Sequence, residues 1–157
     1  MTLLGLKAKI SFIPQAFKRW FPSRQSADTD TRHAAGRWGE AQAERFLKTK
    51  GYKILGRRVR VGDRDELDLV ARDGESLVFV EVKTRHSEDF GRPAEAVDRH
   101  KRHYLSRAAV RYLKALKSPP VCFRFDVVEV IGVEGNPQPR IRHIENAFPL
   151  DRRYRIP

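Results

Sequence analysis

The fold is decided by two short runs of sequence, ELDLVA at residues 66–71 and FVEVK at residues 79–83, with DGES at residues 73–76 between them. Both runs are rich in β-branched and other apolar residues, and the polar segment between them contains glycine, so the stretch predicts a β-hairpin. Side chains alternate between the two faces of a strand. Asp68 therefore points to one face of its strand, and Glu81 and Lys83 share one face of theirs.

Pairing the two strands brings these side chains onto one surface. If residues 73–76 form a four-residue loop, Arg72 pairs with Leu77 and Asp68 lies opposite Glu81. A two-residue loop is expected to shift the partners by two positions and to preserve the faces. Either register predicts that Asp68, Glu81 and Lys83 share a face, and only a bulge or an odd-length loop would separate them.

Opposed carboxylates within apolar strands need a physical reason, because like charges across strands destabilise a sheet. A divalent cation supplies one, since Mg²⁺ and Mn²⁺ prefer oxygen ligands and their charge reverses the repulsion. Lys83 could orient or help deprotonate a water and stabilise charge that develops on a phosphate. A lone Glu-x-Lys on a strand is usually a solvated, salt-bridged face. The full arrangement, with Glu40 on a preceding helix, favours metal-assisted phosphodiester hydrolysis.

Outward from this hairpin, the sequence predicts the element order α-β-β-β-α-β-β. A first helix is expected from about residue 30 to residue 50, with Thr29 or Asp30 as N-cap and Gly51 as the C-terminal stop. The other expected elements are strands at 53–61, 65–72, 77–84, 121–133 and 140–144, a loop at 85–93, and a second helix from 94 or 97 to 117, ended by Pro119 and Pro120. This order predicts an α/β protein with a central mixed sheet flanked by helices.

Length, charge and cysteine content set the broad class. The chain of 157 residues suffices for one domain, expected at residues 31–150, with a C-terminal tail at 151–157. A formal net charge of +12 favours a polyanionic partner, nucleic acid ahead of acidic lipid. No run approaches the roughly 20 apolar residues of a spanning helix, so no transmembrane segment is expected. The single cysteine, Cys122, excludes an intramolecular disulfide, fits a reducing cytoplasm and lies in an apolar run that predicts core packing.

Residues 1–30 differ from the remainder, because the first 27 residues carry five basic side chains and no acid. Lys7 and Lys9 break the apolar run that a secretory signal would need, and Pro14 interrupts any continuous helix. Three interpretations stay open: a basic amphipathic segment that contacts a membrane surface, a poorly ordered extension, or a start codon assigned too early.

The second predicted helix carries a basic stripe at spacings of three or four residues. Its members are His100, His103, Arg107, Arg111 and Lys114. We expect the stripe to contact the phosphates of a nucleic acid, although a solvated helix face is the alternative. The loop of residues 85–92, which begins with Arg85 two residues after Lys83, is expected to touch the same substrate, and a mobile connection is the alternative. Lys101 is spaced with the buried residues of the helix, so it either reaches the acidic cluster or a scissile phosphate, or extends to solvent along the sheet edge.

The sequence does not support a zinc site, a nucleotide-binding loop or a Ser-His-Asp catalytic triad. His100 and His103 lack the further ligands that a zinc site needs. The chain has no Gly-rich phosphate loop and no Ser-His-Asp arrangement at a recognisable spacing, so no small-molecule cofactor is expected.

Four motifs occur in one order: GRWGE at 36–40, ELDLVA at 66–71, FVEVKTR at 79–85 and RFDVV at 124–128. Together they resemble the YraN-like family of bacterial proteins, in the PD-(D/E)xK restriction-endonuclease-like superfamily near the archaeal Holliday-junction resolvases. The resemblance covers about residues 32–148. Leu67 stands where the superfamily's leading proline would precede Asp68, a change that related resolvases tolerate.

The resemblance implies the three-layer restriction-endonuclease-like fold and a role for each acid. Asp68, Glu81 and Glu40 would be ligands of Mg²⁺ or Mn²⁺, and Lys83 the catalytic lysine. Lys101 matches a position from which some superfamily members send a glutamine or lysine into the site. The implied substrate is DNA rather than RNA, with branched or structured DNA favoured, and symmetric cutting of a four-way junction would require a homodimer. The same fold also hosts modules that bind nucleic acid without cutting it, which is the alternative function.

Overall fold

The computed structural model describes residues 31–87, 97–117 and 121–154. The helices and strands are α3 (Thr31–Thr49), β1 (Lys53–Val61), β2 (Asp65–Asp73), β3 (Ser76–Arg85), α4 (Arg99–Ala115), β4 (Phe123–Ile131) and β5 (Arg140–Phe148). Four predictions concern residues outside the described ranges. They are the extension at 1–30 with its N-cap, loop residues 88–93, the two prolines before β4 and residues 155–157.

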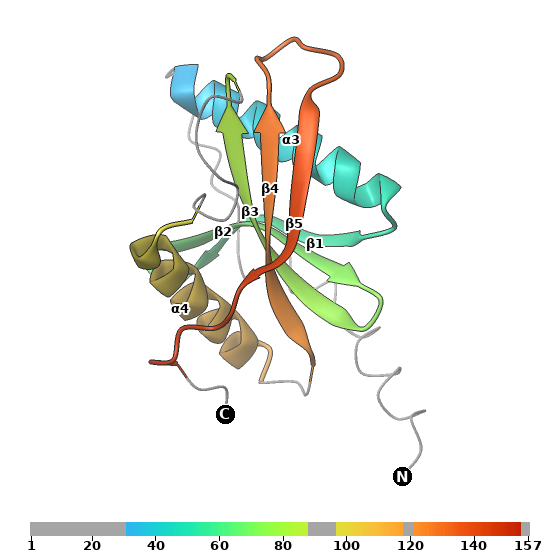
Figure 1. Cartoon of the computed structure of the whole chain (residues 1–157). Coiled ribbons are helices and arrows are strands. Elements are labelled where there is room, and N and C mark those ends of the chain that lie inside the picture. The colour runs from blue at the N-terminus through green and yellow to red at the C-terminus, as the bar shows by residue number, and fades with distance from the viewer. Residues whose placement is uncertain (1–30, 88–96, 118–120, 155–157) are drawn as a thin grey trace.

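The five strands form one sheet in the order β1-β2-β3-β4-β5. Neighbouring strands pair antiparallel except β3 and β4, which are parallel and are connected through α4, as a parallel pair requires. Figure 1 shows α3 on one face of the sheet and α4 on the other. The predicted fold class and element order are confirmed, with β5 running to Phe148 rather than to residue 144. None of the helices in the described ranges combines the length and apolar character needed to cross a bilayer.

Each face of the sheet packs an apolar core against one helix. Leu105 and Tyr112 of α4 pack with Phe79 of β3, whereas Leu47 of α3 packs with Val80. Successive residues of β3 therefore face opposite layers. Complete burial of side chains of this size stabilises the fold by about 1.5–3 kcal/mol each, so both helices are held firmly on the sheet.

The expectation that Cys122 packs in the core was wrong, because its side chain is exposed. Val121 and Phe123 on either side both pack against the core under α4. Strand alternation turns the residue between them outward.

The β2–β3 hairpin has the register in which Arg72 pairs with Leu77. Pairing continues to Asp73 and Ser76, so the loop consists of two residues, and its Gly74 has φ +55°. The expectation that a two-residue loop shifts the partners was wrong, since Asp73 and Ser76 pair without changing the register.

The two strands of this hairpin separate at the end far from the turn. The last pair is Leu69 with Val80, whereas β3 stays paired with β4 as far as Arg85. Among the described residues, the edge of β3 from Glu81 to Arg85 therefore has no strand beside it, and Figure 1 shows β2 turned away from this half of β3. Local pairing stops where the predicted site begins.

Candidate active site

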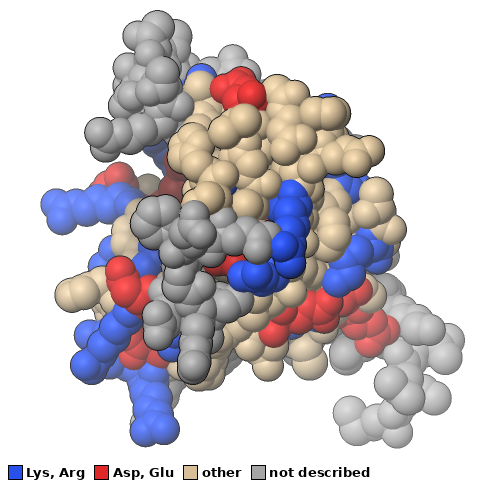
Figure 2. Space-filling view, turned by 45° about the horizontal axis from the view of Figure 1, so that its top comes forward, with Lys and Arg blue, Asp and Glu red and all other residues tan. Residues whose placement is uncertain are grey.

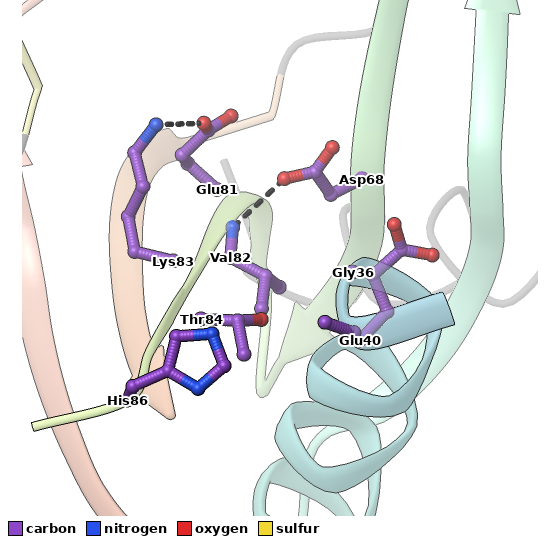
Figure 3. Close-up of a pocket in the computed structure, with 9 residues that line it drawn as sticks. Gly36, Glu40, Asp68, Glu81, Val82, Lys83, Thr84 and His86 are labelled. Atoms are coloured by element: carbon purple, nitrogen blue, oxygen red, sulfur yellow. Dashed lines mark hydrogen bonds and ion pairs between the residues drawn. The ribbon is translucent and has the colours of Figure 1, made fainter. Parts of the chain in front are cut away.

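A pocket of about 530 Å³ opens where β2 and β3 separate (Figure 3). The residues that line it are Ala35, Gly36, Glu40, Asp68, Glu81, Val82, Lys83, Thr84 and His86. The structure thus brings the predicted Asp68, Glu81 and Lys83 into one pocket and adds Glu40 from α3. Asp68 replaces the missing strand contact, because its Oδ2 accepts a 2.8 Å hydrogen bond from the Val82 N–H.

Glu81 is the most deeply buried acid of the pocket, with a side chain only 4% exposed. Lys83 Nζ lies 2.8 Å from its Oε1, and Lys101 Nζ lies 3.1 Å from its Oε2. The Lys101 contact is an ion pair without hydrogen-bond alignment, so Oε2 is buried with no hydrogen-bond partner among the described residues. Among the described residues, the Lys101 ammonium is therefore the only partner of this buried atom, and a bound cation could share or replace that contact, which makes Oε2 a candidate ligand atom.

The electrostatics of the pocket favour an additional positive charge. Burial raises the pKa of Asp68 to about 7, and the neighbouring charge of Glu81 adds to the effect. Burial also raises the pKa of Glu40. Burial acts to lower the pKa of Lys101, but Glu81 and Asp68 outweigh it and the pKa is raised, so Lys101 stays an ammonium. Perturbed carboxyl groups gathered in a pocket are typical of functional sites.

A hard divalent cation fits this donor set chemically. Within the described residues, no three His, Cys, Asp or Glu side chains already surround a common point as metal ligands. The pocket does supply carboxylate oxygens from Glu40 and Asp68 together with Oε2 of Glu81, and these are the oxygen ligands that Mg²⁺ and Mn²⁺ prefer. In the arrangement seen, the ammonium of Lys101 compensates the charge of Glu81.

Asp68 should make the metal-free protein less stable at neutral pH than at about pH 4. A carboxyl whose pKa is higher in the folded than in the unfolded state contributes stability below the unfolded pKa and loses it as pH rises through the folded pKa. For Asp68 the loss runs from about pH 4 to about pH 7. Asp68→Asn, which keeps an acceptor for the Val82 N–H, should be more stable than wild type by about 1–2 kcal/mol at pH 8.

Urea denaturation at pH 4 and pH 8, in the presence of a chelator, measures this difference. The two proteins should be nearly equal at pH 4, where Asp68 is protonated in the folded state. An equal gap at both pH values would contradict the raised pKa.

Gly39 allows α3 to approach β3 closely enough to deliver Glu40. A Cβ built at Gly39 would overlap Thr84 Oγ1 and lie 3.1 Å from Thr84 Cβ. Alanine favours a helix over glycine by up to about 1 kcal/mol, but relieving this overlap would move α3 or Thr84. We expect Gly39→Ala to destabilise the protein by about 1–3 kcal/mol in urea denaturation. Gly36→Ala is the control: in the described part of the chain no atom outside the surrounding helix lies within 4 Å of a Cβ there, and the substitution should stabilise the protein. Equal effects of the two substitutions would contradict the tight contact.

The basic stripe of α4 is partly engaged by acids from elsewhere in the chain. The buried Asp65 accepts hydrogen bonds from Arg107 at 2.7 and 3.0 Å and from Arg111 at 2.6 Å. His103 lies 3.1 Å from Asp151 and stacks on Tyr154, so the first residues of the predicted tail pack on the helix. Figure 2 shows basic side chains interspersed with acidic ones on the side where α4 lies. His100 and Lys114 are exposed.

Arg85 belongs to β3 rather than to the predicted loop. Its Nε lies 3.3 Å from Glu129, a buried acid of β4 that Arg142 also contacts at 3.1 Å. Five residues that line the pocket were not among the predicted site residues: Ala35, Gly36, Val82, Thr84 and His86. Gly36 and Thr84 belong to the motifs GRWGE and FVEVKTR, which could have indicated them. His86 lies in a polar segment that shows no pattern.

The chain matches the family described as "Uncharacterised protein family UPF0102" over residues 39–130, a range that contains all four acidic and basic residues of the predicted centre. It is 44% identical over 117 residues to a UPF0102 protein of Chlorobaculum tepidum, covering 72% of this chain and 90% of that protein. It is 49% identical over 115 residues to a UPF0102 protein of Symbiobacterium thermophilum, covering 72% and 94%. The chain therefore belongs to the UPF0102 family, and the resemblance to the YraN-like family is confirmed.

Proposed function

We propose that the protein binds nucleic acid and hydrolyses phosphodiester bonds with Mg²⁺ or Mn²⁺ held in the pocket of Glu40, Asp68, Glu81 and Lys83. One observation carries the proposal: three carboxylates, one with a buried oxygen that lacks a hydrogen-bond partner among the described residues, meet two lysines where β2 and β3 separate. DNA is the favoured substrate, and branched or structured DNA in particular, in line with the resemblance to the Holliday-junction resolvases.

The charged residues of the pocket would have different roles in the reaction. Glu40, Asp68 and Glu81 would hold the cation, which when bound supplies charge that polarises a phosphate and lowers the pKa of water. Lys83 is placed to orient a water and to donate a hydrogen bond to the phosphate oxygen that gains negative charge. Lys101 holds the Glu81 carboxylate from the α4 side and would contact the same phosphate.

The surface around α4 supports backbone binding. Arg107 and Arg111 share the single carboxylate of Asp65, so the cluster keeps a net positive charge, and His100 and Lys114 are exposed. Phosphate contacts of this kind position a nucleic acid without reading its sequence, and the affinity falls steeply with salt concentration.

A cleavage panel tests the proposal directly. Single-stranded, duplex, flap and four-way DNA, with RNA counterparts, would be incubated with Mg²⁺, with Mn²⁺ and with a chelator. We expect divalent-dependent cleavage that Asp68→Ala abolishes and that Asp63→Ala, a change at an exposed turn aspartate, leaves intact. Calorimetry with Mn²⁺ alone gives a separate measure of metal binding. Absence of both cleavage and divalent binding would refute the enzymatic proposal.

A non-catalytic nucleic-acid-binding module is the second candidate. It is favoured by the two ammonium groups that already compensate Glu81 and by the lack, within the described residues, of a preassembled ligand set. This function predicts salt-sensitive binding to DNA or RNA with no cleavage at any metal concentration.

A further inference from the structure

The pocket extends beyond the acidic cluster along the open edge of β3. Thr84 and His86 line the end of the pocket that lies farther along β3 from Glu81, and Gly36 of α3 lines the pocket one helical turn before Glu40 (Figure 3). A metal centre would use the carboxylates, so the proposed chemistry assigns no role to Gly36, Thr84 or His86.

Packing against the described residues does not require glycine at position 36. A Cβ at this position would meet no atom of the described residues within 4 Å outside its own stretch of helix, in contrast to Gly39 three residues later. Glycine within a helix is unfavourable relative to alanine, so an open position facing a pocket suggests that the space belongs to a ligand. Glu81 independently points to a ligand in the same pocket, because its side chain is 4% exposed and its Oε2 has no hydrogen-bond partner among the described residues.

The open strand edge supplies donors for an anion. The Val82 N–H points away from β4 and reaches Asp68, whereas the Arg85 carbonyl oxygen points towards β4, where it accepts a 2.8 Å hydrogen bond from Gly132. Strand alternation therefore directs the Thr84 N–H to the open edge, on the same side as that of Val82. The exposed imidazole of His86 lines the same end.

We propose that this end of the pocket is a subsite for the nucleotide adjacent to the scissile bond, with its sugar–phosphate backbone passing against Gly36 and its phosphate bound by the Thr84 N–H and the His86 ring. The inference rests on the proposed function and adds the path of the strand, from the acidic cluster along the edge of β3 past α3. Backbone N–H groups and polar side chains are the usual ligands of such phosphates.

Gly36→Leu tests the subsite, with Ala41→Leu as matched control, because Ala41 is exposed on the same helix and does not line the pocket. Binding of a fluorescent oligonucleotide, chosen from the cleaved substrates, would be measured by anisotropy with Ca²⁺ in place of Mg²⁺. We expect Gly36→Leu to weaken binding by about tenfold or more, and Ala41→Leu to leave it unchanged. In cleavage, His86→Ala should raise KM with little change in kcat.

Gly36→Ala covers the case in which the leucine variant fails to fold. It should raise Tm by a few degrees, since helix propensity improves, and still weaken binding by a few-fold. Equal affinity of wild type, Gly36→Leu and Gly36→Ala would overturn the subsite, while loss of cleavage in Asp68→Ala would leave the proposed function standing. A wild-type protein that neither binds nor cuts any oligonucleotide would overturn both.

Discussion

Replacement of Lys83 by methionine should lower the rate of divalent-dependent phosphodiester cleavage by about two to four orders of magnitude and leave the fold intact. The Lys83 Nζ lies 2.8 Å from Glu81 in the acidic pocket, and its side chain is 31% exposed. Methionine keeps much of the length but provides no proton donor and no positive charge. Glu81 would keep its ion pair with Lys101, so the buried carboxylate would not be left alone.

Single-turnover kinetics on the substrate cleaved best would measure the effect, with circular dichroism and urea denaturation as checks on folding. Lys53→Met is the control, because it removes an exposed lysine at the start of β1. We expect that variant to cleave at the wild-type rate. A Lys83→Met protein that retained cleavage within tenfold of wild type would show that Lys83 has no part in the chemistry.

The face shared by Asp68, Glu81 and Lys83 could be predicted because strand alternation is a local property with a period of two. Helical periodicity likewise placed Lys101 among buried residues, and its Nζ lies beside Glu81 rather than in solvent at the sheet edge. Glu40 required the resemblance to a family, since nothing local in the first helix indicates that its glutamate meets a strand over forty residues away.

The separation of β2 from β3, which opens the pocket, could not be predicted from the sequence. Leu67 and Leu69 continue the apolar pattern of β2 through the point where pairing with β3 stops. The end of pairing depends on tertiary packing rather than on local preference. The partners of the α4 stripe were missed for the same reason, because Asp65 and Asp151 are distant from the helix in sequence.

Asp126 provides the clearest case of a motif residue whose role needs the structure. RFDVV at 124–128 was predicted only as part of a strand. The Asp126 side chain is fully buried, accepts hydrogen bonds from Arg124 Nε at 3.0 Å and the Asn146 N–H at 2.9 Å, and lies 2.9 Å from His143 Nε2. This network ties β4 to β5 on the side of the sheet that faces α3, and Phe46 and Tyr52 contact the His143 ring.

Asp126→Ala should destabilise the protein by about 3–5 kcal/mol at pH 7, the largest stability loss that we expect of any single substitution here. The change removes the only carboxylate within hydrogen-bond distance of His143 Nε2 among the described residues, and it leaves the part-buried donors of Arg124 and Asn146 without that acceptor. Asp63→Ala is the control for removal of an aspartate from a solvated turn and should change stability by less than about 0.5 kcal/mol.

The pH dependence distinguishes loss of the charged network from a simple packing defect. Burial acts to raise the pKa of Asp126, but hydrogen bonds from His143, Arg124 and the Asn146 backbone outweigh it and hold the pKa below its usual range. A carboxyl with a lowered folded pKa contributes stability above its unfolded pKa of about 4 and loses it as pH falls through the folded pKa. The difference in unfolding free energy between wild type and Asp126→Asn, measured in urea, should therefore shrink as the pH falls below about 4. A difference that stayed constant down to pH 3 would mean that the ionised carboxylate contributes nothing and that Asp126 only fills space.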